Sequence, residues 1–486
     1  MLFDNRFGAP RNPTRRPDGG TNSHDLLALI GVVCKTGWFA MSEEVIEPPR
    51  VAGSESSSAA ESPPPFSTEA PREIISGWFV PFRALRHRNF RLFFAGQLTS
   101  LTGTWMQTVA QSWLVLKVTN SPLMLGLVTF ANYLPILIVA LFAGVVVDHV
   151  DRRRLIIVAQ VLLMMSAFVL AALTWTGVVR VEHVIILAAF NGLVSSFEMP
   201  GRQAFVVEMV GMEDLPNAIA LNSMMFNGAR TIGPAIAGML IYLVGTATCF
   251  FLNGVSYLAV IWSLVAMNVP RKMVENAGMD MLRRVFEGMT YVWEHRPTFY
   301  LLLVVAINSG LGIQYNVLMP VFAQNILHTG SRGYGILMGA QGIGAVIGAV
   351  MLAWRSGTPR GLRQTLTFGL FLTAISIIAF GFSSSMMFSL IAQLFIGAGL
   401  INYMATTNTM LQIFVSDELR GRVMSFYTMS FIGLAPLGAL MVGALGEHLG
   451  VQATVVICGA LSLGCALLLL TRLNLIREAQ EEAAAA

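Results

Sequence analysis

The sequence predicts an all-α membrane protein with twelve transmembrane helices in two six-helix bundles. Of its 486 residues, 55% are hydrophobic and only 12% are charged, whereas soluble domains are about one-quarter charged. From residue 89 onward, long apolar runs alternate with short polar joints. The two halves of this region also resemble each other weakly. A soluble fold could not bury so much apolar surface, so we expect the chain to cross a bilayer repeatedly.

Twelve apolar runs have the length that a transmembrane helix requires. A hydrocarbon core of about 30 Å takes about 20 helical residues to cross. Helices are expected because hydrocarbon offers backbone amides no partner, and a barrel would show alternating segments of about ten residues. The runs cover residues 89–117, 122–147, 154–176, 182–206, 217–244, 247–268, 298–326, 332–355, 361–382, 385–413, 421–448 and 451–471.

The segments outside these runs divide the chain into five parts. Residues 1–80 are rich in Pro, Ser, Gly and Glu and predict a disordered cytoplasmic tail; a natural start at Met41 is an open alternative for the first 40 residues. An N-terminal bundle is expected at 81–268, a linker at 269–297, a C-terminal bundle at 298–472 and a cytoplasmic tail at 473–486. In the linker, apolar residues recur at helical spacing and predict an amphipathic helix on the cytoplasmic membrane surface: Met281, Val285, Met289, Val292 and Trp293.

Positive charges indicate the orientation. If the N-terminus is cytoplasmic, the inside flanks and loops hold twenty Lys and Arg, and the outside loops hold three, which are Lys117, Arg180 and Arg332. Cytoplasmic loops carry the excess of positive residues. We therefore expect a multi-pass protein of the cell membrane with both termini in the cytoplasm.

An internal repeat relates the two halves. The segment from Met209 into the fifth run matches the segment from Ile413 into the eleventh. Both contain acidic residues, a Leu, a polar turn and a helix of small residues with Pro234 or Pro436 at a similar depth. Such a repeat is expected where two parallel halves rock around a central site.

Several function classes lack their sequence signals. The Lys and Arg are scattered between apolar runs, so nucleic acid is not an expected partner. No nucleotide-binding GxxxxGK[ST] loop occurs, and no cluster of His, Asp or Ser at matching depth offers a nucleophile or metal site. We expect no enzyme, no cofactor and no metal; the expected partners are a small-molecule substrate, protons and the lipid bilayer, and the expected state is a monomer. No disulfide or metal site is expected from the four separated cysteines, Cys34, Cys249, Cys458 and Cys465.

The joint between the second and third runs contains a motif that predicts a gate. A glycine lets two helices approach closely, and a carboxylate can lie against an arginine or a helix N-terminus such as the one near Gly421. Such a contact would hold the halves together on the cytoplasmic side. A simple positive-inside cluster is the alternative. The motif residues are Gly144, Asp148, Asp151, Arg152, Arg153 and Arg154.

The fifth run contains the segment GARTIGPAIAG. Proline can bend this helix, and small residues let it close against a partner, sealing a cavity on one side. Ordinary packing of small residues is the alternative. The motif residues are Gly233, Pro234, Ala237 and Gly238.

These motifs resemble those of a known family. The joint GVVVDHVDRRRL is similar to the major facilitator signature G-x-x-x-D-x-x-[GD]-R-[RK]-x, with His149 and Asp151 as substitutions. The GPAIAG segment is similar to the G-P-x-x-G-G signature of exporters in that superfamily. Over about residues 86–470, stretches such as HRNFRLFFAGQLTSLTGTWMQ and LRGRVMSFYTMSFIGLAPLG resemble enterobactin-exporter-like and macrolide-efflux-like transporters. The resemblance implies a major facilitator fold and efflux of a siderophore, drug or similar amphiphile by proton antiport.

Ionisable residues at depth are candidates for proton coupling, because a charge inside a bilayer is costly without a cavity or a partner. Glu198 lies in the fourth run and Arg230 in the fifth, and these antiparallel runs could bring the two side chains together, with Arg202 one turn from Glu198. Glu198 would then take up and release the coupling proton. The alternatives are a permanent structural ion pair or a pairing of Glu198 with Arg152.

Polar and aromatic residues at mid-depth are candidates for lining the substrate path, although such side chains also serve helix packing. They are Trp105, Gln107, Asn222, Asn227, Gln314, Tyr315, Asn316, Gln341, Asn402 and Tyr403.

Together these features predict a secondary active transporter that exports a small amphiphilic molecule by proton antiport and alternating access. A proton-coupled or facilitative importer of a small solute is one alternative. A membrane receptor or scaffold that transports nothing is the other.

Overall fold

The computed structural model describes residues 80–267, 289–355 and 359–485. Within these ranges the regular elements are helices, and no strand is found. The expected tail and most of the expected amphipathic linker helix, including Met281 and Val285, lie outside them. The described end of that linker, Met289–Glu294, is helical. Its Val292 is buried while Trp293 is 68% exposed.

The first half begins with a short 3-10 helix and continues with five assigned helices. Helix α5 is 64 residues long and covers both the fourth and the fifth expected runs. Its backbone leaves the helical region at Gly211, where φ is 71°, a conformation that glycine adopts at little cost. The elements are η1 (Val80–Arg86), α2 (Arg88–Thr119), α3 (Pro122–His149), α4 (Arg152–Trp175), α5 (Val181–Val244) and α6 (Thr246–Ala266).

The second half starts with a span of mixed helix types. This span contains α8 (Arg296–Ile307), η2 (Asn308–Gly312), η3 (Ile313–Leu318), α9 (Met319–Val321) and η4 (Phe322–Ile326), where η2 and η4 are π-helical. The remaining helices are α10 (Gly330–Arg355), α11 (Pro359–Gly381), α12 (Met386–Phe414), α13 (Asp417–Gly433), α14 (Ala435–Leu449), α15 (Val451–Thr471) and α16 (Leu473–Ala485). The expected eleventh run is thus divided between α13 and α14.

Local signals fix where several helices begin. Ser121 precedes α3 and its side chain accepts a hydrogen bond from the backbone N–H of Met124. Asp151 does the same for α4 through Arg154 N, over 3.0 Å. These N-cap contacts satisfy backbone donors that the first turn leaves free. Short polar joints therefore end one helix and start the next.

Ten helical segments within the described ranges are long and apolar enough to cross a membrane. One of them is α5, which is long enough for two crossings. Helix α2 occupies the first expected run but is not among the ten. The protein is therefore an integral membrane protein whose described regular elements are helices, and the number twelve stays a prediction.

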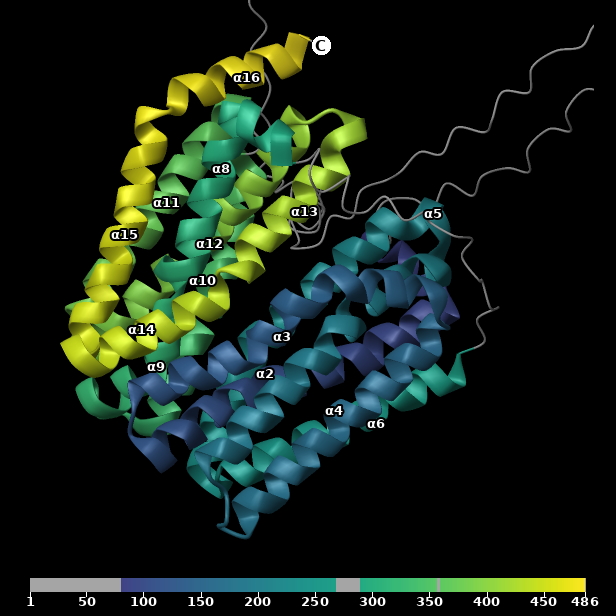
Figure 1. The fold of residues 1–486 in the computed structure, drawn as a ribbon, viewed down its shortest axis with the longest axis vertical. Helices are drawn as coiled ribbons and strands as arrows, with labels where there is room; N and C mark the ends of the chain where they lie inside the picture. Colours follow the sequence, from purple (N-terminus) through teal and green to yellow (C-terminus); the bar gives the residue numbers. More distant parts are fainter. Residues whose placement is uncertain (1–79, 268–288, 356–358, 486) are drawn as a thin grey trace, which may run out of the picture.

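The helices form two groups that share one region of core. One buried cluster contains residues of the first half only, such as Phe93 and Leu264, and another contains residues of the second half only, such as Tyr403 and Leu469. A third cluster joins the halves and includes Trp113. Figure 1 shows the two groups of helices meeting at the lower left, near α9, α14 and α2, and diverging toward the upper right.

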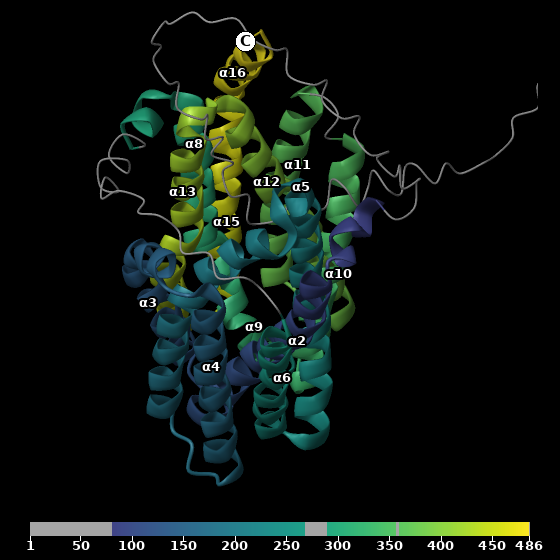
Figure 2. The ribbon, with the colours of Figure 1, turned by 90° about the vertical axis from the view of Figure 1, so that its right-hand side faces the viewer.

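The two groups of helices meet at one end of the molecule, which we call the closed end, and diverge at the other, which we call the open end. The closed end is where the α2–α3 joint meets the end of α14. The open end holds η1, the joint between α3 and α4 and the start of α13. Figure 2 shows the view turned by 90°, in which α16 lies beyond the end of the second half. Helix α16 is anchored there, because its Ile476 is fully buried in the core of that half.

Candidate functional site

At the closed end, α3 of the first half packs closely on α14 of the second. A Cβ added to Gly126 would lie 2.5 Å from the carbonyl oxygen of Ala439, so only glycine allows this approach. Gly443 faces the same contact from α14. Glu447 completes it, because its carboxylate accepts hydrogen bonds from Ser121 Oγ over 2.7 Å and from Leu123 N over 3.3 Å.

A second contact between the halves joins α5 to α10. A Cβ on Gly238 would lie 2.7 Å from Gly335 Cα and 2.9 Å from Ser331 O. A Cβ on Gly335 would in turn lie 2.8 Å from Pro234 O. This is where the structure places the Gly-Pro motif. Ala237 of that motif is fully buried, while Gly233 faces Trp105 of α2 within the first half.

The two contacts are related by the internal repeat. Helix α5 contains the fifth run and α14 the end of the eleventh, which the repeat makes equivalent. Helices α3 and α10, the second and eighth runs, are then equivalent as well. Each half therefore presents the same two helices to the other, as expected of two bundles that rock on a shared contact.

The expected gating motif lies at the open end, and its described side chains bind within the first half. Arg152 Nη1 donates to Glu208 Oε1 over 2.8 Å. Arg153 donates to the carbonyl oxygens of Leu264 and Val265 at the end of α6. Arg154 lies 3.5 Å from Asp151, the N-cap of α4. Gly144 and Asp148 belong to α3, but the surroundings of both residues lie outside what the structure describes, as does the expected contact of Asp148 with the helix start near Gly421.

Glu198 forms a buried ion pair within α5. Arg202 Nε lies 2.9 Å from Glu198 Oε1, and both residues are less than one-tenth exposed. Gln160 of α4 donates to the same carboxylate oxygen over 3.3 Å. The pairing of Glu198 with Arg152 is not found, because Arg152 binds Glu208 instead. Glu198 is therefore held by one cation and one amide.

Arg230 does not meet Glu198, contrary to the sequence expectation. Its described electrostatic neighbours are the phenol groups of Tyr133 on α3 and Tyr315 on η3. Tyr133 belongs to the first half and Tyr315 to the second. The cation beside Glu198 is Arg202, one turn away on the same helix. Arg230 thus lies between the halves without a carboxylate partner among the described side chains.

Tyr315 is the centre of a buried polar network in the second half. Its hydroxyl donates to Gln393 Oε1 over 3.0 Å and accepts from Gln341 Nε2 over 3.1 Å. All three side chains are at most 4% exposed. The network joins η3, α10 and α12 beside Arg230. Tyr315 and Gln341 were candidates from the sequence, but Gln393 was not. Its sequence position does not distinguish it from an amide that only packs between helices, and its role follows from its contact with Tyr315.

The other cavity candidates are spread over the molecule. Gln107 accepts from Asn253 of α6 over 2.7 Å, Asn402 donates to Ala398 O, and Gln314 donates to Ser309 O. Tyr403 is fully buried in the core of the second half. On α5, Asn227 donates to Ser223 O. The remaining candidates are Trp105, packed edge-on against Phe226, and Asn222 and Asn316, each with a buried side-chain oxygen that accepts no hydrogen bond from a described group.

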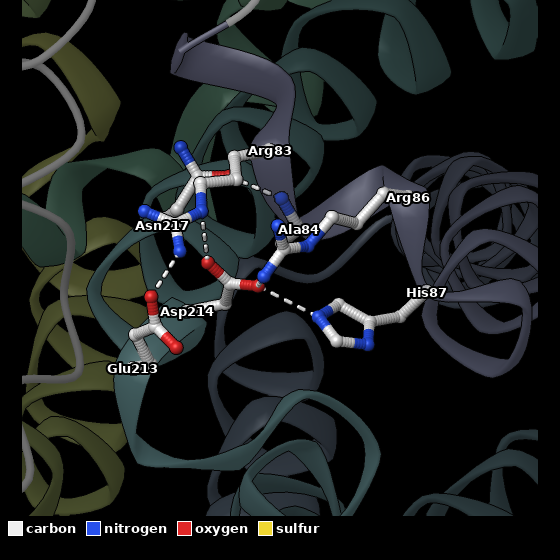
Figure 3. A network of polar contacts seen from close by, with 7 residues as sticks. All are labelled: Arg83, Ala84, Arg86, His87, Glu213, Asp214 and Asn217. Atoms are coloured by element: carbon white, nitrogen blue, oxygen red, sulfur yellow. Dashed lines mark hydrogen bonds and ion pairs between the residues drawn. The ribbon is translucent and has the colours of Figure 1, made fainter. Parts of the chain in front are cut away.

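A polar cluster at the open end was missed as a site from the sequence. Figure 3 shows Arg83, Arg86 and His87, from η1 and the start of α2, converging on Asp214 of α5. Asp214 is 2% exposed, and its carboxylate lies 2.8 Å from Arg83, 2.8 Å from Arg86 and 2.7 Å from His87. Arg83 also pairs with the exposed Glu213, and Ala84 N donates to Asn217 Oδ1 over 2.8 Å. The sequence contained a signal for this cluster, because Glu213 and Asp214 belong to the internal repeat. The cluster was missed because Arg83 and Arg86 were interpreted only as indicators of membrane orientation.

The cluster keeps Asp214 ionised. Burial alone would raise the pKa of this carboxyl, but the hydrogen bond from His87 and the charges of Arg83, Arg86 and His87 outweigh burial and lower the pKa below its usual value of 3.8. The segment before α2 is thereby fastened to the joint between the fourth and fifth expected runs.

Solved structures share this architecture. The crystal structure of a bacterial homolog of the human lysosomal transporter Spinster, in an inward-facing and unoccupied conformation, matches with a TM-score of 0.59 at 14% identity, covering 82% of this chain and 97% of that one. At this identity the likeness concerns the fold alone.

Sequence comparisons identify the family. The staphyloferrin A transporter of Staphylococcus aureus is 27% identical over 76% of this chain and 92% of its own length. Macrolide efflux protein A of Streptococcus pyogenes is 22% identical over 81% of this chain and 98% of its own length. The family model described as transmembrane secretion effector matches residues 79–486. This chain is a membrane transporter, not an enzyme, and belongs to the transmembrane secretion effector family of the major facilitator superfamily.

Proposed function

We propose that this transporter exports a small amphiphilic molecule by proton antiport, with the two halves alternating between two arrangements. The observation that carries the proposal is the one-sided contact between the halves. Helices α3 with α14 and α5 with α10 meet at the closed end, and the groups of helices diverge toward the open end. An arrangement that is shut at one end and separated at the other is what alternating access requires.

The direction of export rests on relatives and charge. The relatives named above are an efflux protein and a transporter of staphyloferrin A. The open end holds the arginines of the expected gating motif and of η1, and positive residues favour the cytoplasmic side. We place the open end and both termini in the cytoplasm of a plasma-membrane protein, ready to receive a substrate from inside the cell.

Glu198 is the proposed proton carrier. It is a buried carboxylate in an expected membrane span, held by Arg202 and Gln160. Protonation would release Arg202, so the two protonation states favour different local arrangements. We also propose that the protein works as a monomer in the lipid bilayer, because a single chain supplies both halves of the transport path. No cofactor takes part in the proposed cycle.

Accumulation of a drug and siderophore panel in cells tests export and its energy source. Cells that contain the protein should retain less of at least one compound than cells that lack it, and collapse of the proton gradient should remove the difference. An unchanged difference after collapse would argue against proton antiport. Higher retention in cells with the protein would favour import instead.

Replacement of Glu198 by Gln tests the coupling site. The variant should lose gradient-dependent export and keep substrate binding, because glutamine has the size of the glutamate side chain but cannot take up or release a proton. Glu182→Gln, which removes an exposed carboxylate at the start of α5, serves as a control for loss of a carboxylate. Retained gradient dependence in Glu198→Gln would give Glu198 a structural role only.

A further inference from the structure

We propose that Arg230 binds an anionic group of the transported molecule, so that the substrate class consists of amphiphilic acids. The inference rests on the proposed function and adds the chemistry that the site recognises. Arg230 is a cation in an expected membrane span, with electrostatic partners in both halves.

The charge of Arg230 has no counter-charge in the described part of the chain. The other ionisable pair at depth, Glu198 with Arg202, is complete within α5. The described neighbours of Arg230 are the neutral phenols of Tyr133 and Tyr315. An isolated cation in a membrane span is costly unless it faces water or a partner. A guanidinium in this situation is a site for a carboxylate or similar anion, which it can bind with two parallel hydrogen bonds.

Arg230 lies where such an anion could act on both halves. It comes from α5 of the first half, and Tyr315 comes from the second. The next residue, Thr231, marks the neighbouring contact between the halves, because a Cβ on Gly342 of α10 would lie 2.6 Å from its Oγ1. A substrate anion held at Arg230 would therefore sit beside the contact that must open for release.

The surroundings suit an amphiphile. Tyr315, Gln341 and Gln393 form a connected polar group beside the cation. Tyr133 is 39% exposed and offers an aromatic face on the first-half side. A cation with nearby amide, hydroxyl and aromatic groups matches a molecule that carries an acidic group on an apolar or aromatic body.

Matched acid and amide probes test the proposal on the purified full-length protein. We would measure dissociation constants, at constant ionic strength, for 1-naphthylacetate against 1-naphthylacetamide and for 4-biphenylacetate against 4-biphenylacetamide. Within each pair only the charge changes substantially. The protein should prefer the acid by about tenfold or more, the value of a hydrogen-bonded charge. An acid-to-amide ratio near one, or no binding of either acid, would overturn the proposal.

Variants assign the preference to Arg230. Arg230→Gln should bring the ratio close to one by weakening only the acid, and Arg230→Lys should keep part of the preference. Arg332→Gln removes an exposed arginine from α10 and should behave like the natural protein. Acid preference that survives in Arg230→Gln would overturn the assignment. If Arg230→Gln does not fold, Arg230→Lys decides, because it must weaken acid binding severalfold and leave amide binding unchanged.

Export of the same probes separates this inference from the proposed function. Gradient-dependent export restricted to amides would contradict the anion site and leave proton-coupled export standing. Arg230-dependent acid binding without any export of the acids would support the site and contradict the export of these molecules.

Discussion

Charged side chains in this transporter differ in how their charge is compensated. Asp214 is surrounded by Arg83, Arg86 and His87, and Glu198 is paired with Arg202, whereas the described electrostatic partners of Arg230 are two phenols. Compensated charges fasten one segment to another. An uncompensated charge at depth indicates a ligand. We therefore expect different effects from removing the charge of Asp214, Glu198 or Arg230.

Asp214→Asn should destabilise the protein at neutral pH by about 1–3 kcal/mol, because it removes the anion from a cluster whose cations are partly exposed. The pKa of Asp214 is lowered in the folded protein, so its contribution is complete above the usual value of 3.8 and is lost as pH falls through the lower folded value. Thermal unfolding of both proteins should differ from pH 5 to 8 and converge in stronger acid.

Glu213→Gln is the matched control for this prediction. Glu213 pairs with Arg83 but its side chain is 77% exposed, so its replacement should change the unfolding temperature little. Equal effects of the two substitutions, or a difference for Asp214→Asn that does not shrink as the pH falls far below 3.8, would contradict the proposed fastening of η1 to α5.

At this scale the sequence indicated which residues are unusual and left their partners open. Glu198, Arg202 and Arg230 were recognised because charges are rare in apolar runs. The suggested proximity of Glu198 to Arg230 is not found among the described contacts, and Arg202, one turn away, supplies the cation instead. The i,i+4 spacing of Glu198 and Arg202 was visible in the sequence, whereas the position of Arg230 relative to Glu198 depends on how the two runs pack, which hydropathy does not show.

Among the helices, small residues determine where the two halves touch. The α5–α10 contact depends on Gly238 and Gly335, whose backbones approach so closely that added side chains would strike backbone atoms. Gly335→Leu should therefore prevent closure at this end. We expect strongly reduced transport and lower cross-linking efficiency between cysteines introduced at Ser121 and Glu447, which lie in contact in the natural protein.

Gly464→Leu provides the comparison, because nothing lies within 4 Å of a Cβ added at Gly464 on α15. It should leave transport and cross-linking unchanged. Full cross-linking in Gly335→Leu would show that the α5–α10 contact is not needed to close that end.

The order of the helices followed from hydropathy, and their internal irregularities did not. Each expected run is occupied by helix, since hydrocarbon leaves the backbone no other choice. The π-helical segments of the seventh run and the division of the eleventh between α13 and α14 depend on tertiary contacts instead. At Gly438, just after that division, the added Cβ would collide with Gly310 O. Helix α16 was expected only as a tail, because its short amphipathic sequence gains its burial from the second half.

For the whole molecule, the central claim is that the closed and open ends exchange roles during transport. The repeat in the sequence suggested two rocking halves, and the structure adds which helices meet. The Asp214 cluster and the Arg152–Glu208 pair lie within the first half, so that half can move as one body. The α3–α14 and α5–α10 contacts are then the ones that must break.

Distances between spin labels measured at both ends test this claim most directly. Labels at the exposed positions Val118 and His448 report on the closed end, and labels at Val150 and Ser425 report on the open end, in a protein whose native cysteines are replaced. On addition of an exported substrate and a proton gradient, the Val118–His448 distance should lengthen while the Val150–Ser425 distance shortens. Two distances that stay fixed, or that lengthen together, would contradict alternating access.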